Sequence, residues 1–79
     1  MEIDRKATGT RLKRLLQERG MKAVDLQRLL SLENHQPVYK WLNGKSLPSL
    51  EHLCRIAEVL ETSVEDILVY RKESARKEE

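Results

Sequence analysis

The residues best suited to a chemical role lie at positions 38–45, where apolar and polar side chains separate onto two faces of a predicted helix. One face is apolar: Val38, Trp41 and Leu42. The other face offers a phenol, an ammonium group and an amide: Tyr39, Lys40 and Asn43. Gly44 can take the left-handed conformation that ends a helix, and Lys45 follows it directly. A helix fixed on one side, with donors and positive charge on the other, suits contact with a polyanion.

The remaining reactive side chains do not form a catalytic or metal-binding set. His35 and His52 fall on different predicted helices, and Cys54 lies on an apolar stripe, where a thiol is expected to be buried and inert. The sequence has no Ser/His/Asp set, no Gly-rich phosphate loop and no paired carboxylates at useful spacing. We therefore expect no enzymatic activity, no metal site and no cofactor.

Length and composition indicate one small domain. A chain of 79 residues has little room for a deep pocket, so we expect no small-molecule ligand. The single cysteine cannot form an internal disulfide. There is no signal peptide and no apolar run near the roughly 18 residues of a membrane span, which predicts a soluble, cytoplasmic protein without membrane contact.

The charge is divided between the two halves of the chain. Residues 5–45 carry ten basic side chains against three acidic ones, whereas residues 46–70 carry one basic side chain against five acidic ones. A basic half beside an acidic half is typical of a nucleic-acid binder whose acidic face points away from the phosphates. Ordinary solvated helix charge is the alternative, and the asymmetry alone does not choose between them.

The apolar spacing predicts an all-α, compact bundle of about five short helices. The expected ranges are about 5–19, 23–30, 34–43, 50–60 and 62–68. Asp4 and Ser49 are the expected N-caps, and Thr62 with Glu65 is expected to form a capping box. The inward-facing residues are predicted to be Leu12, Leu15, Leu16, Val24, Leu26, Leu29, Leu30, Val38, Trp41, Leu42, Leu50, Leu53, Cys54, Ala57, Leu60, Val64, Ile67 and Leu68. Residues 71–79 have no apolar stripe and are expected to be a frayed or disordered charged tail.

The ordered set of motifs over residues 7–70 resembles the Cro/repressor (XRE-like) helix-turn-helix family. The resemblance is carried by Arg11-Leu12, Gly20, Leu26, Leu30, residues 38–41, residues 43–45, residues 48–50 and the helix pattern through Leu68. It implies a lambda-repressor-like fold for residues 1–70, with the helix-turn-helix formed by the second and third helices. It also implies that the third helix, about 34–43, lies in the major groove of double-stranded DNA and that a homodimer binds a two-fold operator. Members of this family are mostly bacterial and phage transcriptional regulators.

The chain departs from the family pattern at three places. The segment between Leu30 and Val38 is one residue longer than usual, and Ser31 stands where the turn often has Gly. Ala23 replaces a Gln that often contacts a phosphate. Gln27 replaces a small residue at the crossing of the second and third helices, so either the crossing is wider or the Gln27 side chain turns aside.

Positions relative to Val38 and Trp41 predict which residues of the third helix contact DNA. Base readout is predicted for His35, Gln36, Tyr39 and Lys40, because their donors, acceptors and rings can match base edges in the major groove. Phosphate contacts are predicted for Arg11, Asn34, Asn43 and Lys45. The extra residue between Leu30 and Val38 leaves open which of residues 34–36 reaches the bases. Each residue also has a structural alternative, such as helix capping by Gln36 or a plain C-cap at Asn43.

These observations predict a sequence-specific DNA-binding transcriptional regulator, with repression as the expected action. The predicted dimer contacts are Val69 and Tyr70, after the last helix. Two rival functions are kept. One is an antitoxin that holds a toxin protein on the acidic side of the fourth and fifth helices; the other is a protein-binding module without DNA readout, which would lack the steep salt dependence of phosphate contacts.

Overall fold

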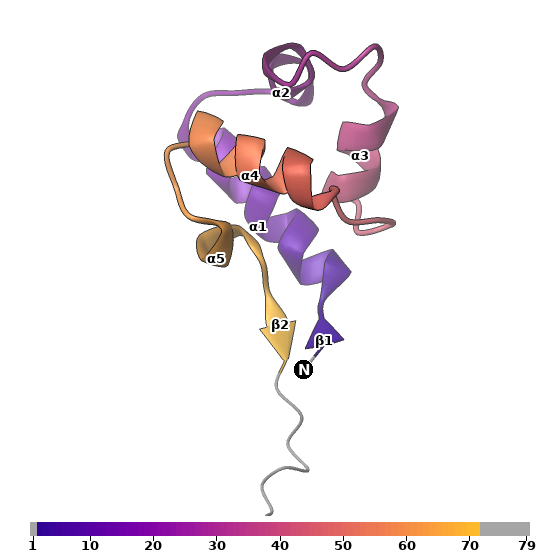
Figure 1. Cartoon of the computed structure of the whole chain (residues 1–79), viewed down its shortest axis with the longest axis vertical. Helices are drawn as coiled ribbons and strands as arrows, with labels where there is room; N and C mark the ends of the chain where they lie inside the picture. Colours follow the sequence, from indigo (N-terminus) through magenta and orange to yellow (C-terminus); the bar gives the residue numbers. More distant parts are fainter. Residues whose placement is uncertain (1, 72–79) are drawn as a thin grey trace, which may run out of the picture.

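The computed structural model describes residues 2–71. Its elements are β1 (Glu2–Ile3), α1 (Arg5–Glu18), α2 (Ala23–Leu29), α3 (Gln36–Leu42), α4 (Leu50–Val59), α5 (Val64–Ile67) and β2 (Tyr70–Arg71). The predicted all-α bundle is confirmed over this range, and every expected helix is present within two residues of its predicted bounds. In Figure 1, α1 runs behind α4, while α2 and α3 lie at the other end of the bundle from the two strands.

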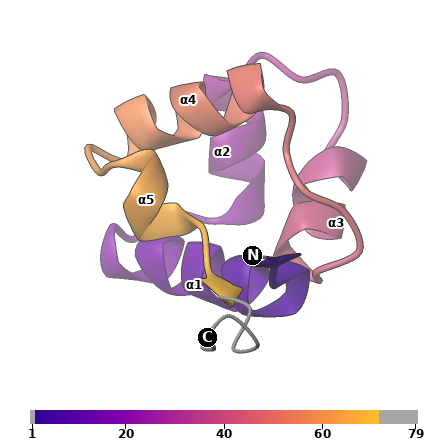
Figure 2. The same ribbon diagram turned by 60° about the horizontal axis from the view of Figure 1, so that its bottom comes forward.

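Figure 2 shows the helices arranged as a frame around the core, with α1 along one edge, α4 along the opposite edge, and α3 and α5 on the two remaining sides. The interior is filled by apolar side chains from all five helices and the turns after them: Leu12, Leu16, Leu26, Leu30, Val38, Trp41, Leu42, Leu53, Ile56, Ala57, Leu60 and Ile67. This packing of short helices at large angles buries one narrow stripe of each helix.

Local signals at the helix ends explain why the helices begin and end where they do. The Asp4 carboxylate accepts from the Ala7 amide at 2.9 Å, and the Ser49 hydroxyl accepts from the His52 amide at 3.2 Å, so both predicted N-caps are confirmed. The predicted capping box at α5 is wrong by one residue. Ser63 is the N-cap and accepts from the Asp66 amide at 3.1 Å.

Four helices end with one residue in the left-handed region, after which the chain turns sharply. Two of these residues are the glycines Gly20 and Gly44. The other two, Ser31 and Glu61, have φ of 58° and 54° and therefore carry the strain that a side chain meets there. Ser31 thus performs the role that Gly performs in the usual family pattern, at some cost in stability.

Four residues that the sequence predicted to face inward are exposed. On α4 the buried stripe includes Ile56, and it leaves Leu50 75% exposed and Cys54 exposed. At about 100° per residue, Ile56 shares one face with Leu53, Ala57 and Leu60, whereas Cys54 lies about 160° away from Ile56, so the predicted place of Cys54 on the apolar stripe is wrong. On α2, a seven-residue helix that meets the core along one edge, Leu26 and Leu30 are buried while Val24 and Leu29 are exposed.

The sequence did not predict the short sheet at the ends of the described chain. β1 pairs antiparallel with β2, with Glu2 opposite Arg71 and Ile3 opposite Tyr70. The pairing continues beyond the strands, because the Asp4 amide donates to the Val69 carbonyl at 2.8 Å and the Val69 amide donates to the Thr8 hydroxyl at 2.9 Å. Of the predicted charged tail, Arg71 belongs to β2 and residues 72–79 lie outside the described residues.

Candidate nucleic-acid interface

The α3 helix is delimited by local hydrogen bonds at both ends. At its start, the Asn34 side-chain oxygen accepts from the Gln36 amide at 3.0 Å, and Pro37 lies in the first turn, where its missing N–H costs little. At its end, the Gly44 amide donates to the Trp41 carbonyl and the Lys45 amide donates to the Lys40 carbonyl at 2.9 Å. These two bonds make a Schellman motif, so the predicted ending at Gly44 is confirmed.

The apolar face of α3 fixes its orientation against the rest of the domain. Val38, Trp41 and Leu42 are all buried, as predicted. The α1 helix approaches α3 so closely at Gly9 that an added Cβ would lie 2.5 Å from the Trp41 carbonyl oxygen. The polar face of α3 is therefore held outward by rigid backbone contact as well as by apolar packing.

Six of the eight predicted DNA-contact residues line one hollow on the exposed side of α3. They are His35, Gln36, Tyr39, Lys40, Asn43 and Lys45, and the hollow has a volume of about 380 Å³. All six side chains are exposed. The His35 and Tyr39 rings meet edge to face with centroids 5.2 Å apart, which orders the middle of this surface. We call it the α3 hollow.

The two other predicted contact residues lie elsewhere. Asn34 is exposed just before α3, and its side-chain oxygen is engaged by the Gln36 amide. Arg11 is turned toward α5, where its guanidinium donates to the Asp66 carbonyl at 3.2 Å. Arg11 thus shares no surface with the α3 hollow, and the sequence could not reveal the carbonyl that holds it.

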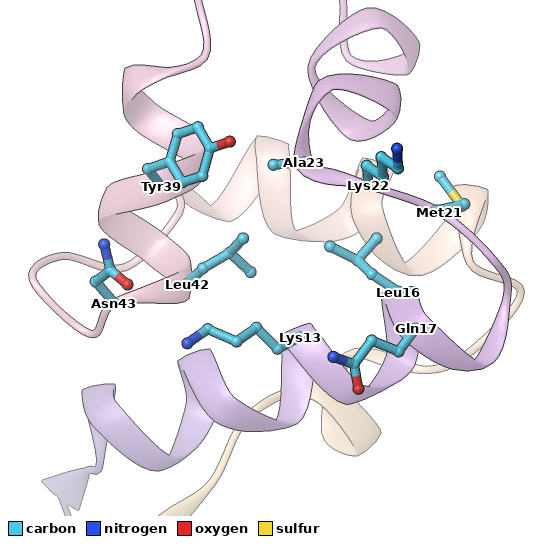
Figure 3. A pocket seen from close by; sticks show the side chains of 9 residues that line it. All are labelled: Lys13, Leu16, Gln17, Met21, Lys22, Ala23, Tyr39, Leu42 and Asn43. Atoms are coloured by element: carbon cyan, nitrogen blue, oxygen red, sulfur yellow. The ribbon is translucent and has the colours of Figure 1, made fainter.

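A second hollow lies between α1, the start of α2 and α3 (Figure 3). It has a volume of about 500 Å³ and is lined by Lys13, Leu16, Gln17, Met21, Lys22, Ala23, Tyr39, Leu42 and Asn43. We call it the α1–α3 hollow. Sequence reasoning gave no role to Lys13 or Gln17, and their one signal is that they lie four residues apart on the exposed side of α1. Tyr39 and Asn43 line both hollows.

The turn between α2 and α3 accommodates the unusual Gln27. Its side-chain amide donates to the Leu32 carbonyl at 3.3 Å, so the side chain turns aside into the turn. This bond satisfies a loop carbonyl and links α2 to the segment that leads to α3. The longer connection is therefore held by the residue that replaces the usual small one.

The ion pairs of the described residues lie outside the two hollows. In the part of the chain that the structure describes, the ion pairs involve Arg14 with Glu18, Arg19 with Glu18, and Arg71 with Glu2. The four lysines of the hollows take part in none of these pairs: Lys13, Lys22, Lys40 and Lys45. Their ammonium groups are therefore available to phosphates.

The side chains considered for catalysis or metal binding are dispersed. His52 packs against the Trp41 ring at 5.7 Å, far along the chain from His35, and Cys54 is exposed on α4. Residues 2–71 contain no group of three or more His, Cys, Asp or Glu side chains that could hold a metal ion. Over the same residues, the helices lack the length and apolar character needed to cross a membrane.

Solved structures of other proteins share this fold. The restriction-modification controller protein C.AhdI from Aeromonas hydrophila matches with a TM-score of 0.74 and 23% identity, over 81% of this chain and 96% of that one. A transcriptional regulator from Listeria innocua matches with a TM-score of 0.74 and 25% identity, over 92% of this chain and 64% of that one. No curated protein matches this chain significantly.

The family model for the Cro/C1-type helix-turn-helix DNA-binding domain matches residues 11–73, which is most of the chain. This match confirms the resemblance drawn from the sequence and the helix-turn-helix formed by α2 and α3. The chain belongs to the family of Cro/C1-type helix-turn-helix DNA-binding domains.

Proposed function

We propose that this DNA-binding transcription regulator binds double-stranded DNA in a sequence-specific manner, with α3 in the major groove. The observation that carries the proposal is the α3 hollow, where six residues chosen for their chemistry lie together on one exposed face. Gln36 can bond in bidentate fashion to adenine, and Lys40 can donate to guanine. His35 and Tyr39 lie beside them, and Asn34 flanks the same end of α3.

Asn43 and Lys45 are the proposed phosphate contacts on this surface. They lie at the end of α3 and just beyond it, where the Schellman motif fixes the backbone. Contacts of this kind set the position of the protein on the duplex but carry no sequence information. Arg11 is not one of these proposed phosphate contacts, because its guanidinium is held against α5.

Repression through a homodimer on a two-fold operator is the proposed mode of action. Tyr70 is the better of the two proposed dimer contacts, because its side chain is 46% exposed. The Val69 backbone is already bonded to Asp4 and Thr8 within the chain. A dimer of this kind would need half-site centres about 34 Å apart or a multiple of that distance.

A protein partner on the acidic side of the domain is a second candidate. Four carboxylates on or beside α4 and α5 are exposed: Glu58, Glu61, Glu65 and Asp66. They would suit a basic partner such as a toxin protein, and they lie on different elements from the two hollows. The antitoxin role could therefore coexist with DNA binding by α3.

Selection of binding sites from a random duplex library, at about 150 mM salt, tests the proposal. We expect one enriched motif with two-fold symmetry and half-sites about one helical turn apart. Retention of DNA without any enriched sequence would contradict base readout by α3. It would leave an electrostatic surface and favour the protein-binding alternative.

A further inference from the structure

We infer that Gln27 of α2 is a positioning residue for base readout: its side chain fixes the connection between α2 and α3, and so sets where His35 and Gln36 meet the bases. The inference rests on the proposed function above, because it concerns the accuracy of sequence readout by α3. Gln27 acts through the backbone of the turn and not by touching DNA.

Hydrogen bonds from α2 hold the turn in one conformation. The Leu32 amide donates to the Gln27 carbonyl at 3.0 Å and the Ser31 amide donates to the Arg28 carbonyl at 3.0 Å, which together make a Schellman motif. Such a motif is often accompanied by an apolar contact between the two residues that stand here as Gln27 and Leu32. A polar bond takes that place, because the Gln27 side-chain amide donates to the Leu32 carbonyl at 3.3 Å. Both backbone groups of Leu32 are therefore bonded to a single residue.

Leu32 is the anchor point of the connection. Its side chain is half-buried and packs against the core, whereas the side chains of residues 33–36 are all exposed. The residue before it, Ser31, has φ of 58° and is strained. The Gln27 side-chain bond offsets part of this strain and fixes the direction in which the chain leaves Leu32.

The two ends of α3 are held differently. The second half is fixed by Trp41 and Leu42, which are buried and meet the backbone of α1 closely. The first turn has bonds within itself, since the Gln36 amide donates to the Asn34 side chain at 3.0 Å. The His35 and Gln36 side chains, which line the α3 hollow, project from this exposed end. Their position therefore depends on the connection from α2.

Base readout is more sensitive to such positioning than phosphate contact is. A bidentate bond to a base edge requires both polar atoms of an amide side chain to be in place at once. The supporting residues must hold that geometry to within about 0.5 Å. An ammonium group acts on a phosphate as a point charge and tolerates more movement. Loosening the connection should thus lower sequence discrimination while general affinity for DNA is kept.

Gln27→Met is the test, because it removes the donor and keeps an uncharged, unbranched side chain of similar length. Binding of the full chain to the selected duplex and to an unrelated duplex is measured by fluorescence anisotropy. We expect the ratio of the two affinities to fall about 10-fold, which lies within the discrimination given by one bidentate pair. Affinity for the unrelated duplex and its salt dependence should stay unchanged, because no phosphate contact is lost.

Ile56→Val on α4 is the matched control for stability. Ile56 is fully buried and does not line the α3 hollow. Removal of one buried methyl group lowers stability by an amount similar to the loss of one hydrogen bond. Ile56→Val should therefore keep the affinity ratio of the unmodified protein, and a loss equal to that of Gln27→Met would overturn the inference.

Addition of Ser31→Gly to Gln27→Met separates positioning from stability. Glycine removes the left-handed strain, so the double variant should regain stability in urea denaturation. Its affinity ratio should stay low, because the Leu32 carbonyl still lacks its donor. Recovery of the ratio together with stability would make Gln27 a merely structural residue and overturn the inference.

The unmodified protein separates this inference from the proposed function. A duplex library from which it enriches no motif contradicts base readout by α3, and the inference falls with it. An enriched motif together with an unchanged affinity ratio in Gln27→Met overturns the inference alone.

Discussion

The seating of α3 on α1 depends on a single glycine, and Gly9→Ala tests it. An added Cβ would lie 2.5 Å from the Trp41 carbonyl oxygen and 2.6 Å from the Leu42 carbonyl oxygen. Both are backbone atoms at the end of α3, so no side-chain rotation can relieve the overlap. The α3 helix would have to move away from α1, and Trp41 and Leu42 would move with it.

Two opposing effects set the size of the change. Within a helix, Ala is favoured over Gly by about 1 kcal/mol. Overpacking a fixed site costs about 1–3 kcal/mol and sometimes more, and the backbone overlap here places Gly9 at the upper end. We expect a net loss of about 2 kcal/mol in the free energy of unfolding, which corresponds to a fall in Tm of roughly 8–16 °C for a domain of this size.

Urea denaturation followed by Trp41 fluorescence measures this loss, since Trp41 is the single tryptophan and is buried beside α1. Gly20→Ala is the control: a Cβ there meets nothing within 4 Å, but φ is +65°, so it should cost about 1–2 kcal/mol from backbone strain alone. A Gly9→Ala protein as stable as the original, or more stable, would refute the account of how α3 is held.

Substitutions on α3, α4 and the α2–α3 turn test the contact face and the core separately. Gln36→Ala should cost about 1–3 kcal/mol on the selected site and little on unrelated DNA, by anisotropy; equal losses would make Gln36 a backbone contact. Lys45→Ala should weaken all sequences alike and lower the salt slope by about one, and an unchanged slope would remove it from the phosphate contacts. In urea denaturation, Ile56→Ala should cost about 2–5 kcal/mol and the exposed Leu50→Ala less than about 0.5, whereas similar losses would contradict the orientation of α4. Ser31→Gly should stabilise the chain by about 0.5–1 kcal/mol by relieving its left-handed strain, and a loss would mean that the Ser31 side chain contributes more than that strain.

The parts of the fold that were predictable from sequence are those fixed by local signals. Asp4 and Ser49 cap helices through their own side chains, and Asn43-Gly44 ends α3 through one left-handed residue. The apolar face of α3 was also predictable, because Val38, Trp41 and Leu42 repeat at helical spacing. These signals require no knowledge of the neighbouring helices.

Features that depend on distant neighbours were not predictable. The strands of the small sheet are two residues long and join positions at the two ends of the described chain, so they leave no periodic pattern. Lys13 looks like any exposed lysine in the sequence, and only the packing of α1 against α3 brings it to a hollow beside Asn43.

The central claim is that the exposed side of α3 is the surface that meets DNA, and an NMR titration of the isotope-labelled protein with its selected duplex tests it most directly. We expect the backbone amides with the largest shifts to lie at residues 34–45. Shifts concentrated on α4 and α5, with residues 34–45 unchanged, would contradict it.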